Sequence, residues 1–366
     1  MIRETNGRAP AKVNLFLHVG AKRRDGYHDL TSLVVFPDVG DEVLVSTMPV
    51  IPAKARQGRK PGPIVERALA TSVVRDDEWV PGLAPRPLAR HDDAGRRIRF
   101  TIKGPFAKDL EAQGHPPSLR EYSPQHAAGK SREAKSSPTP VREVPRSGEG
   151  GNLVLRAAMA LAPGRQTPAT KIVLVKNLPI ASGIGGGSAD AAATIRILNE
   201  AWRLRLTKEE LRAFGLTLGS DVPVCIDPKP QWMEGRGERL ERGPRMPEVY
   251  MTLVNPGVPV PTAAVFKMLS KKSGSKRPQA PRSFSSARSL AKWLDAETRN
   301  DLQPPAIQIA PPVADVLARL NAQDGCLLAR MSGSGATCFG LFETARGAKR
   351  AAAAMTKTWW AKAAAL

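Results

Sequence analysis

The stretch that decides the fold is a glycine-rich run in the middle of the chain, Pro179-Ile180-Ala181-Ser182-Gly183-Ile184-Gly185-Gly186-Gly187-Ser188-Ala189. It follows a strand predicted at residues 172–175 and precedes a helix predicted at residues 188–202. Closely spaced glycines let the backbone approach an anion and point its N–H groups inward. The helix that starts at Ser188 adds the positive end of its dipole. The run therefore predicts a cradle for phosphate groups, and we expect all of its residues to line a nucleotide site.

Other kinds of glycine-rich loop fit this run less well. A Walker A loop ends in Gly-Lys-Ser/Thr, whereas this run ends in Gly-Ser-Ala. A Rossmann fingerprint needs an acidic residue that closes a second strand about 20 residues on, and Glu200 falls inside the predicted helix instead. A tight turn without a ligand stays open, although each glycine costs about 0.5–1 kcal/mol of chain entropy.

Composition places the chain among globular proteins that handle anions. Its 366 residues are 42% hydrophobic, which is enough for two domains with buried cores. The net charge of +21 favours nucleotides, phosphorylated metabolites or nucleic acid as partners. Because the basic residues are spread along the chain and aromatic residues make up only 5%, we expect a small-molecule substrate and no nucleic acid. A basic surface that serves only solubility is the alternative.

Cysteine usage and hydropathy predict a cytoplasmic protein. Cys225, Cys326 and Cys338 are far apart and lack the spacing of a zinc site, so we interpret them as reduced thiols. The N-terminus has no apolar stretch typical of a signal peptide, and no run of about 18 apolar residues occurs. We expect no membrane partner, and a monomer or a homodimer.

The remaining patterns mix helices and strands without a regular βαβ repeat, which predicts the α+β class. Val13, Leu15 and Leu17 alternate with other residues, as in a half-buried strand. Asn152 and Thr262 are predicted to cap helices over residues 153–161 and 262–269, and the chain should end in an amphipathic helix. Two irregular segments, residues 51–97 and 111–149, are predicted to be insertions or flexible loops.

Several further motifs accompany the glycine run, in a fixed order along the chain. They are Pro10-Ala11-Lys12-Val13-Asn14-Leu15-Phe16-Leu17, Arg23-Arg24-Asp25-Gly26-Tyr27-His28-Asp29-Leu30, Leu218-Gly219-Ser220-Asp221-Val222-Pro223-Val224, Asn255-Pro256-Gly257-Val258-Pro259-Val260-Pro261-Thr262 and Met331-Ser332-Gly333-Ser334-Gly335-Ala336-Thr337. Together with the glycine run they resemble the signatures of the GHMP kinases, the superfamily of galactokinase, homoserine kinase and mevalonate kinase. The resemblance covers most of residues 9–47, 98–110, 150–270 and 325–345.

This resemblance implies an α+β, two-domain GHMP kinase architecture. A ribosomal-S5-domain-2-like domain would span residues 1–240 and bind ATP, and a ferredoxin-like domain would span residues 241–366. The turn at residues 23–30 is similar to that of the members that act on 4-diphosphocytidyl-2-C-methyl-D-erythritol in the non-mevalonate route to isopentenyl diphosphate. These members transfer a phosphoryl group from ATP, with Mg²⁺, to the 2-hydroxyl of that substrate.

The resemblance also implies a role for one lysine and one carboxylate. Phosphoryl transfer to an alcohol needs alignment, neutralisation of the phosphate charge and an acceptor for the hydroxyl proton. The family pattern assigns the acceptor to Asp221 and assigns stabilisation of the forming alkoxide to Lys12. From the residues alone, the favoured interpretations are a helix cap or turn for Asp221 and a surface lysine for Lys12.

The remaining site residues follow from the resemblance in the same way. Tyr27 and Phe266 would lie against the cytosine ring, where stacking is worth about 1–3 kcal/mol per base, with core packing as the alternative for both. His28 would hydrogen-bond the base and Asn14 would hold the erythritol part, while Ser188 and the loop N–H groups would hold the ATP phosphates. Further substrate contacts would come from Thr262 and from the second domain, through Gly333, Ser334 and Gly335. No ligand for Mg²⁺ is evident.

Two alternatives stay open. The chain could be a GHMP kinase for another small alcohol such as homoserine or a sugar, or a non-catalytic basic binding protein on the same scaffold. Ala189 also departs from the family pattern, because many members have serine there.

Overall fold

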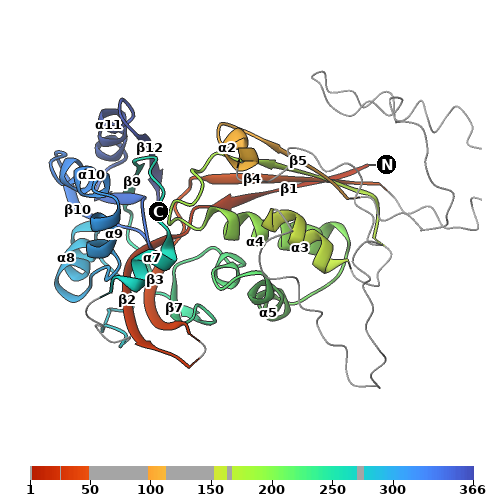
Figure 1. The fold of residues 1–366 in the computed structure, drawn as a ribbon, viewed down its shortest axis with the longest axis horizontal. Coiled ribbons are helices and arrows are strands. Elements are labelled where there is room, and N and C mark those ends of the chain that lie inside the picture. The colour runs from red at the N-terminus through yellow and green to blue at the C-terminus, as the bar shows by residue number, and fades with distance from the viewer. Residues whose placement is uncertain (1, 25, 49–97, 113–151, 163–166, 270–275) are drawn as a thin grey trace, which may run out of the picture.

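The computed structural model describes residues 2–24, 26–48, 98–112, 152–162, 167–269 and 276–366 (Figure 1). The two predicted insertions therefore lie almost entirely outside the described residues. Within the described residues, twelve strands form three four-stranded sheets. No helix in these ranges is both long and apolar enough to cross a membrane.

The first sheet has the strand order β1-β4-β6-β5 and carries the glycine run at one end. Its strands are β1 (Arg3–Pro10), β4 (Gly40–Thr47), β5 (Ile98–Lys103) and β6 (Thr170–Val175), with only the β5–β6 pair parallel. Buried and exposed residues alternate along β4 and β6, and one face packs on helices α3 (Leu153–Leu161) and α4 (Gly186–Ala201) (Figure 1). Short helices α2 (Ala107–Ala112), α5 (Lys208–Leu218) and α6 (Val222–Cys225) complete this part.

The second and third sheets meet at the centre of the molecule. The second sheet, in the order β2-β3-β7-β8, contains β2 (Val13–Lys22), β3 (His28–Val35), β7 (Gln231–Gly235) and β8 (Arg239–Arg242). The third, in the order β10-β11-β9-β12, contains β9 (Tyr250–Asn255), β10 (Cys326–Met331), β11 (Cys338–Phe342) and β12 (Trp360–Ala365). The helices of this half are α7 (Thr262–Lys267), α8 (Ala287–Glu297), α9 (Gln303–Ile309), α10 (Pro312–Asn321) and α11 (Ala345–Met355).

Strand β2 is buried on both faces, so the prediction of a half-buried strand is wrong. Every residue from 13 to 20 is buried. Leu15 and Phe16 join a core that contains Phe339 of the third sheet, whereas Leu17 and Val19 join a second core beneath α9 and α10. A strand enclosed by two cores needs apolar residues at consecutive positions, which the alternating pattern concealed.

Helix boundaries follow the predictions in part. Asn152 caps α3 as predicted, because its side chain accepts a hydrogen bond from the N–H of Val154 at 2.8 Å. Helix α4 begins at Gly186, two residues earlier than predicted, and Pro261 rather than Thr262 precedes α7. The C-terminal helix α11 is amphipathic as predicted, but the chain continues into strand β12, which pairs with β9.

A buried arginine joins the second sheet to the C-terminal half. Arg330, on β10, is 7% exposed. Its guanidinium donates hydrogen bonds to the carbonyls of Leu15, Leu294 and Thr298 at 3.0–3.1 Å and to the hydroxyl of Thr298 at 2.7 Å. Burial lowers the pKa of Arg330 to about 10. One side chain thus connects β2, which leads out of the first motif, to helix α8.

We expect Arg330→Met to lower the free energy of unfolding by about 1–3 kcal/mol, because four acceptors lose their donor in a buried place. Urea unfolding followed by circular dichroism measures the change. Arg288→Met is the control, since Arg288 forms an exposed pair with Glu343 and should change stability by less than about 1 kcal/mol. Equal losses in the two variants would contradict this account.

Candidate active site

The structure places Lys12 and Asp221 in direct contact. Lys12 lies just before β2, and Asp221 occupies the position before α6. Lys12 Nζ lies 2.9 Å from Asp221 Oδ2, and the side chains are 5% and 40% exposed. Asp221 makes no capping hydrogen bond to α6, so its carboxylate is directed to the lysine rather than to the backbone. A buried ammonium thus supports a carboxylate that solvent, or a ligand, can reach.

The glycine run lies against the same lysine. The N–H of Lys12 donates to the carbonyl of Ile184 at 2.9 Å. Gly185 precedes α4 with φ +62°, and a Cβ there would lie 3.0 Å from Lys12 Cε. Because α4 begins at Gly186, the N–H groups of Gly186, Gly187 and Ser188 fall in its first turn, where they have no intrahelical acceptor. Free N–H donors at a helix N-terminus beside an ammonium are a suitable place for phosphate oxygens.

The loop at residues 331–337 contacts the glycine run from the C-terminal half. The N–H of Thr337 donates to the carbonyl of Ser182 at 3.0 Å, and the hydroxyl of Ser332 donates to that of Gly183 at 3.1 Å. A Cβ on Gly183, which has φ +73°, would lie 2.5 Å from the carbonyl oxygen of Gly335. The two glycine loops therefore approach one another backbone to backbone, and the site is shared by both halves of the chain.

Asn14 lies where these two loops meet, and its side-chain oxygen has no hydrogen-bond partner. It is 1% exposed, its N–H donates to the hydroxyl of Ser332 at 3.1 Å, and its side-chain amide donates to Ser32 Oγ at 2.7 Å. Its Oδ1 is buried with no hydrogen-bond partner and would lie 3.5 Å from a Cβ on Gly333. An unpaired acceptor at this position suits a hydroxyl donor on a ligand.

The residues predicted to surround a base lie at the turn between β2 and β3 and on α7. Phe266 stacks on His28 with ring centroids 5.4 Å apart, and His28 Nδ1 lies 3.3 Å from the carbonyl of Gly20. Phe266 also packs on a hydrophobic core, whereas Tyr27 is 52% exposed with the guanidinium of Arg236 5.2 Å from its ring centroid. The alternative prediction, that these side chains pack in a core, is therefore wrong for Tyr27 and correct in part for Phe266. Rings already in contact leave no room for a third between them, so a base would bind on an outer face.

Thr262 and Ser334 connect this region to the glycine loops. Their hydroxyl oxygens lie 2.8 Å apart, so the side chain of Thr262 contacts the loop at residues 331–337 and does not cap the helix. Helix α7 is thereby held beside the site (Figure 1).

A buried cluster of charges beneath the glycine run was not predicted. The ammonium of Lys176 donates hydrogen bonds to Asp41 Oδ2 and, at 2.9 Å, to Asp190 Oδ2, and all three side chains are at most 3% exposed. Burial raises the pKa of Asp190 well above its usual range despite the attraction of Lys176. Burial lowers the pKa of Lys176, but the two carboxylates outweigh it and the pKa is raised. The only sequence signal was a carboxylate among alanines in the predicted helix.

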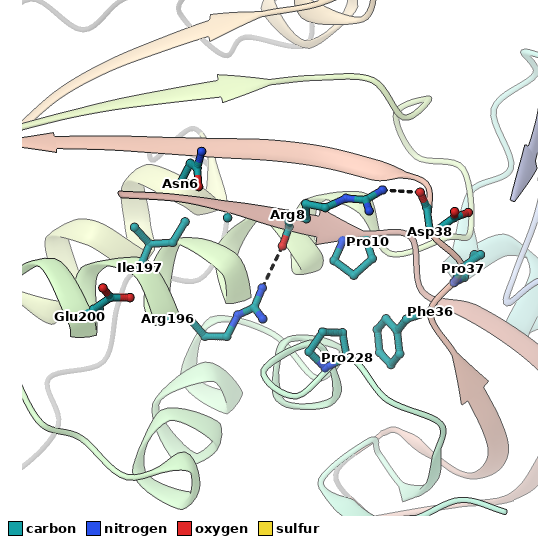
Figure 2. A pocket seen from close by; sticks show the side chains of 11 residues that line it. Asn6, Arg8, Pro10, Phe36, Pro37, Asp38, Arg196, Ile197, Glu200 and Pro228 are labelled. Carbon is teal, nitrogen blue, oxygen red and sulfur yellow. Dashed lines mark hydrogen bonds between the residues drawn. The ribbon is translucent and has the colours of Figure 1, made fainter. Parts of the chain in front are cut away.

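A separate pocket of ≈ 470 Å³ lies between β1, α4 and the segment after α6 (Figure 2). Arg196 points to the edge of β1 and donates to the carbonyl of Arg8 at 2.9 Å. Apolar surface from Pro10, Phe36 and Pro228 faces it across the opening. This pocket contains none of the predicted site residues, and we assign the candidate active site to the two glycine loops instead.

Comparison with known proteins identifies the fold and the family. Residues 152–227 match the family "GHMP kinases N terminal domain", and residues 280–361 match "GHMP kinases C terminal". A solved structure titled 4-(cytidine 5'-diphospho)-2C-methyl-D-erythritol kinase covers 99% of the chain at 24% identity, with a TM-score of 0.62 and 98% of its own chain covered. Mevalonate kinase from L. major covers 99% at 12% identity with a TM-score of 0.56 and 96% of its own chain covered. These likenesses show the two-domain GHMP kinase fold.

The family matches in both halves of the chain, together with curated relatives, show that the chain is a GHMP kinase, the class expected from the motifs. Two curated relatives then narrow the class. One, from Cereibacter sphaeroides, is 40% identical over 361 residues, with 97% of both chains covered, and another, from Mesorhizobium japonicum, is 39% identical with 94% and 89% covered. Both are 4-diphosphocytidyl-2-C-methyl-D-erythritol kinases, and this chain belongs to that family of GHMP kinases.

We expect Gly183→Ala to abolish most nucleotide binding, because the new methyl group would meet the loop at residues 331–337. Gly257→Ala is a matched control. Gly257 has φ +74°, almost the same as Gly183, but a Cβ there has nothing within 4 Å. Both variants bear the cost of a positive φ, about 1–2 kcal/mol, and only the first bears the steric clash. Isothermal titration with ADP would separate the two effects, and equal affinities would refute the role of the close approach.

Proposed function

We propose that this chain transfers the terminal phosphoryl group of ATP to the 2-hydroxyl of 4-diphosphocytidyl-2-C-methyl-D-erythritol. The products are the 2-phosphate and ADP, and the reaction belongs to the methylerythritol phosphate pathway of isopentenyl diphosphate biosynthesis. The observation that carries the proposal is the pair formed by Lys12 and Asp221, 2.9 Å apart against the glycine run, in a chain 40% identical over its length to such a kinase.

The glycine run binds the nucleotide in this proposal. The first-turn N–H groups of α4 and the hydroxyl of Ser188 donate to phosphate oxygens, and the helix dipole favours their negative charge. Among the described residues no group of three acidic, histidine or cysteine side chains could hold a metal on its own. Mg²⁺ held mainly through the phosphates of ATP would need few protein ligands, which fits these residues, and it would neutralise phosphate charge when bound.

Lys12 and Asp221 act on the alcohol. Asp221, at 40% exposure, accepts a hydrogen bond from the substrate 2-hydroxyl, aligns it with the phosphate and takes its proton as the new P–O bond forms. Lys12 is held by its own backbone contact with Ile184 and stabilises negative charge on the hydroxyl oxygen and the transferred group. The unpaired Oδ1 of Asn14 accepts from another hydroxyl of the erythritol part.

The cytidine end of the substrate lies across β2 and β3 in this proposal. The base packs on the outer face of the His28 and Phe266 pair, with Tyr27 beside it, and Thr262, Gly333, Ser334 and Gly335 contact the substrate between the base and the phosphates. The proposal also keeps the division into domains at residues 1–240 and 241–366, except that β8 (Arg239–Arg242) crosses this boundary and pairs with β7. In its support, the third sheet uses only residues from Tyr250 onward.

We expect Asp221→Asn to lower kcat about 100-fold or more while the KM for ATP changes little, because the amide aligns the hydroxyl but cannot take its proton. A coupled assay of ADP release with the cytidylated substrate measures this. Asp227→Asn is the control, since Asp227 pairs with Lys208 at 2.7 Å outside the site and should retain wild-type turnover. Unchanged kcat in Asp221→Asn would remove Asp221 from its role.

The same assay with homoserine and galactose tests the substrate. Turnover of either at the rate of the cytidylated alcohol would contradict the assignment.

We expect Phe266→Ala to raise the KM for the cytidylated substrate about tenfold, with the KM for ATP unchanged, because one stacking face is worth about 1–3 kcal/mol. Trp359→Ala provides the comparison, as Trp359 is also a partly buried aromatic residue packed on the same core. A parallel rise in both KM values would show that Phe266 only supports the fold.

A further inference from the structure

The glycine run is bracketed by the buried charges of Lys176, Asp41 and Asp190. Asp41 Oδ1 accepts hydrogen bonds from the N–H groups of Asn177 at 2.5 Å and Leu178 at 2.8 Å, immediately before the run. Asp190 follows Ala189 immediately after the run and accepts from the ammonium of Lys176 at 2.9 Å. The same ammonium donates to Asp41. Both ends of residues 179–189 are thus tied to one buried cation.

The ammonium also contacts the start of α4. A Cβ on Gly186 would lie 3.0 Å from Lys176 Nζ and 3.7 Å from Asp41 Oδ2. Gly186 has no positive φ to require glycine, so the space taken by the ammonium accounts for the missing side chain. The cluster therefore lies against the first turn of α4 at Gly186, next to Gly185, where Lys12 makes its own close approach.

We propose that Lys176 is a positioning residue for the nucleotide, which acts through Asp41 and Asp190 to fix both ends of the glycine run so that the first turn of α4 faces the triphosphate. The inference rests on the proposed function, since it takes ATP as the ligand of this loop. Lys176 itself touches no substrate. Buried ion pairs contribute little net stability but hold groups in one geometry, because the alternative arrangements leave a charge unpaired. Small displacements of a binding loop cost much affinity.

The design of variants follows from the charges. Lys176→Met alone leaves the buried carboxylates without a cation and could fail to fold. The double variant Lys176→Met/Asp41→Asn removes one charge of each sign and keeps the volume. Asp190→Asn keeps the shape of the side chain and an oxygen acceptor for Lys176, whose ammonium still contacts Asp41, and it serves as the conservative variant. Lys208→Met, which breaks an exposed lysine–aspartate pair, is the control for loss of a lysine elsewhere.

The test measures binding of a non-hydrolysable ATP analogue by isothermal titration, with the KM for the alcohol from kinetics and the melting temperature for each protein. We expect the analogue to bind about tenfold or more weakly to Lys176→Met and to the double variant, with the KM for the alcohol changed by less than about twofold. Asp190→Asn, which keeps an acceptor for the ammonium, should lose less affinity than these two variants, and Lys208→Met should bind the analogue as the wild type does.

Three outcomes would overturn the inference. The first is a folded double variant that binds the analogue with wild-type affinity. The second is a parallel loss of affinity for both substrates, which would show a general structural role. The third is a double variant that fails to fold, because the cluster would then serve stability rather than position. Nucleotide binding is measured directly, independently of turnover. A wild-type protein that binds ATP but does not phosphorylate the cytidylated alcohol would therefore refute the proposed function, but the affinities of the variants could still be compared.

Discussion

The close approach of two glycine loops at Gly183 is the constraint on which the rest of the site depends. One loop ends the first sheet and opens α4, whereas the other joins β10 to β11, more than a hundred residues later in the chain. Their backbones meet at a distance that excludes any side chain. The side-chain amide of Asn300 supports this contact from behind, because it donates to the carbonyls of Met331 and Gly333 at 2.8 Å. A correct site therefore requires that both halves of the chain have folded and docked.

Two lysines lie beside the glycine run, and the different surroundings of their side chains indicate different roles. Lys12 has one carboxylate partner, Asp221, which solvent reaches, so a ligand can enter the arrangement without a buried charge being left alone. Lys176 has two carboxylate partners and is only 3% exposed, so a ligand cannot enter. An open pair suits chemistry on a substrate, and a closed cluster suits a fixed framework. This difference could not be read from the residue types, which are the same in both places.

Local signals in the sequence were sufficient for much of the fold and for the content of the site. The cap at Asn152 and the glycine run with its helix depend on neighbouring residues, and the structure contains both, although the helix begins two residues earlier than predicted. The contact of Lys12 with Asp221 was expected only because the motifs resembled a family, since no local rule joins residues so far apart. The burial of β2 on two sides, the strand after α11 and the cluster at Lys176 depend on partners distant in sequence. A pattern of neighbours contains no information about such partners.

The substrate end of the site is built on a different principle from the nucleotide end. Around the glycine run, hydrogen bonds and excluded volume leave one backbone arrangement, which suits a triphosphate common to many kinases. Across β2 and β3 the surface consists of side chains: a ring pair formed by His28 and Phe266, and an exposed Tyr27 in contact with Arg236. Side chains can be exchanged without disturbing a backbone cradle. In the proposed function, selectivity for one alcohol over another therefore belongs to this face.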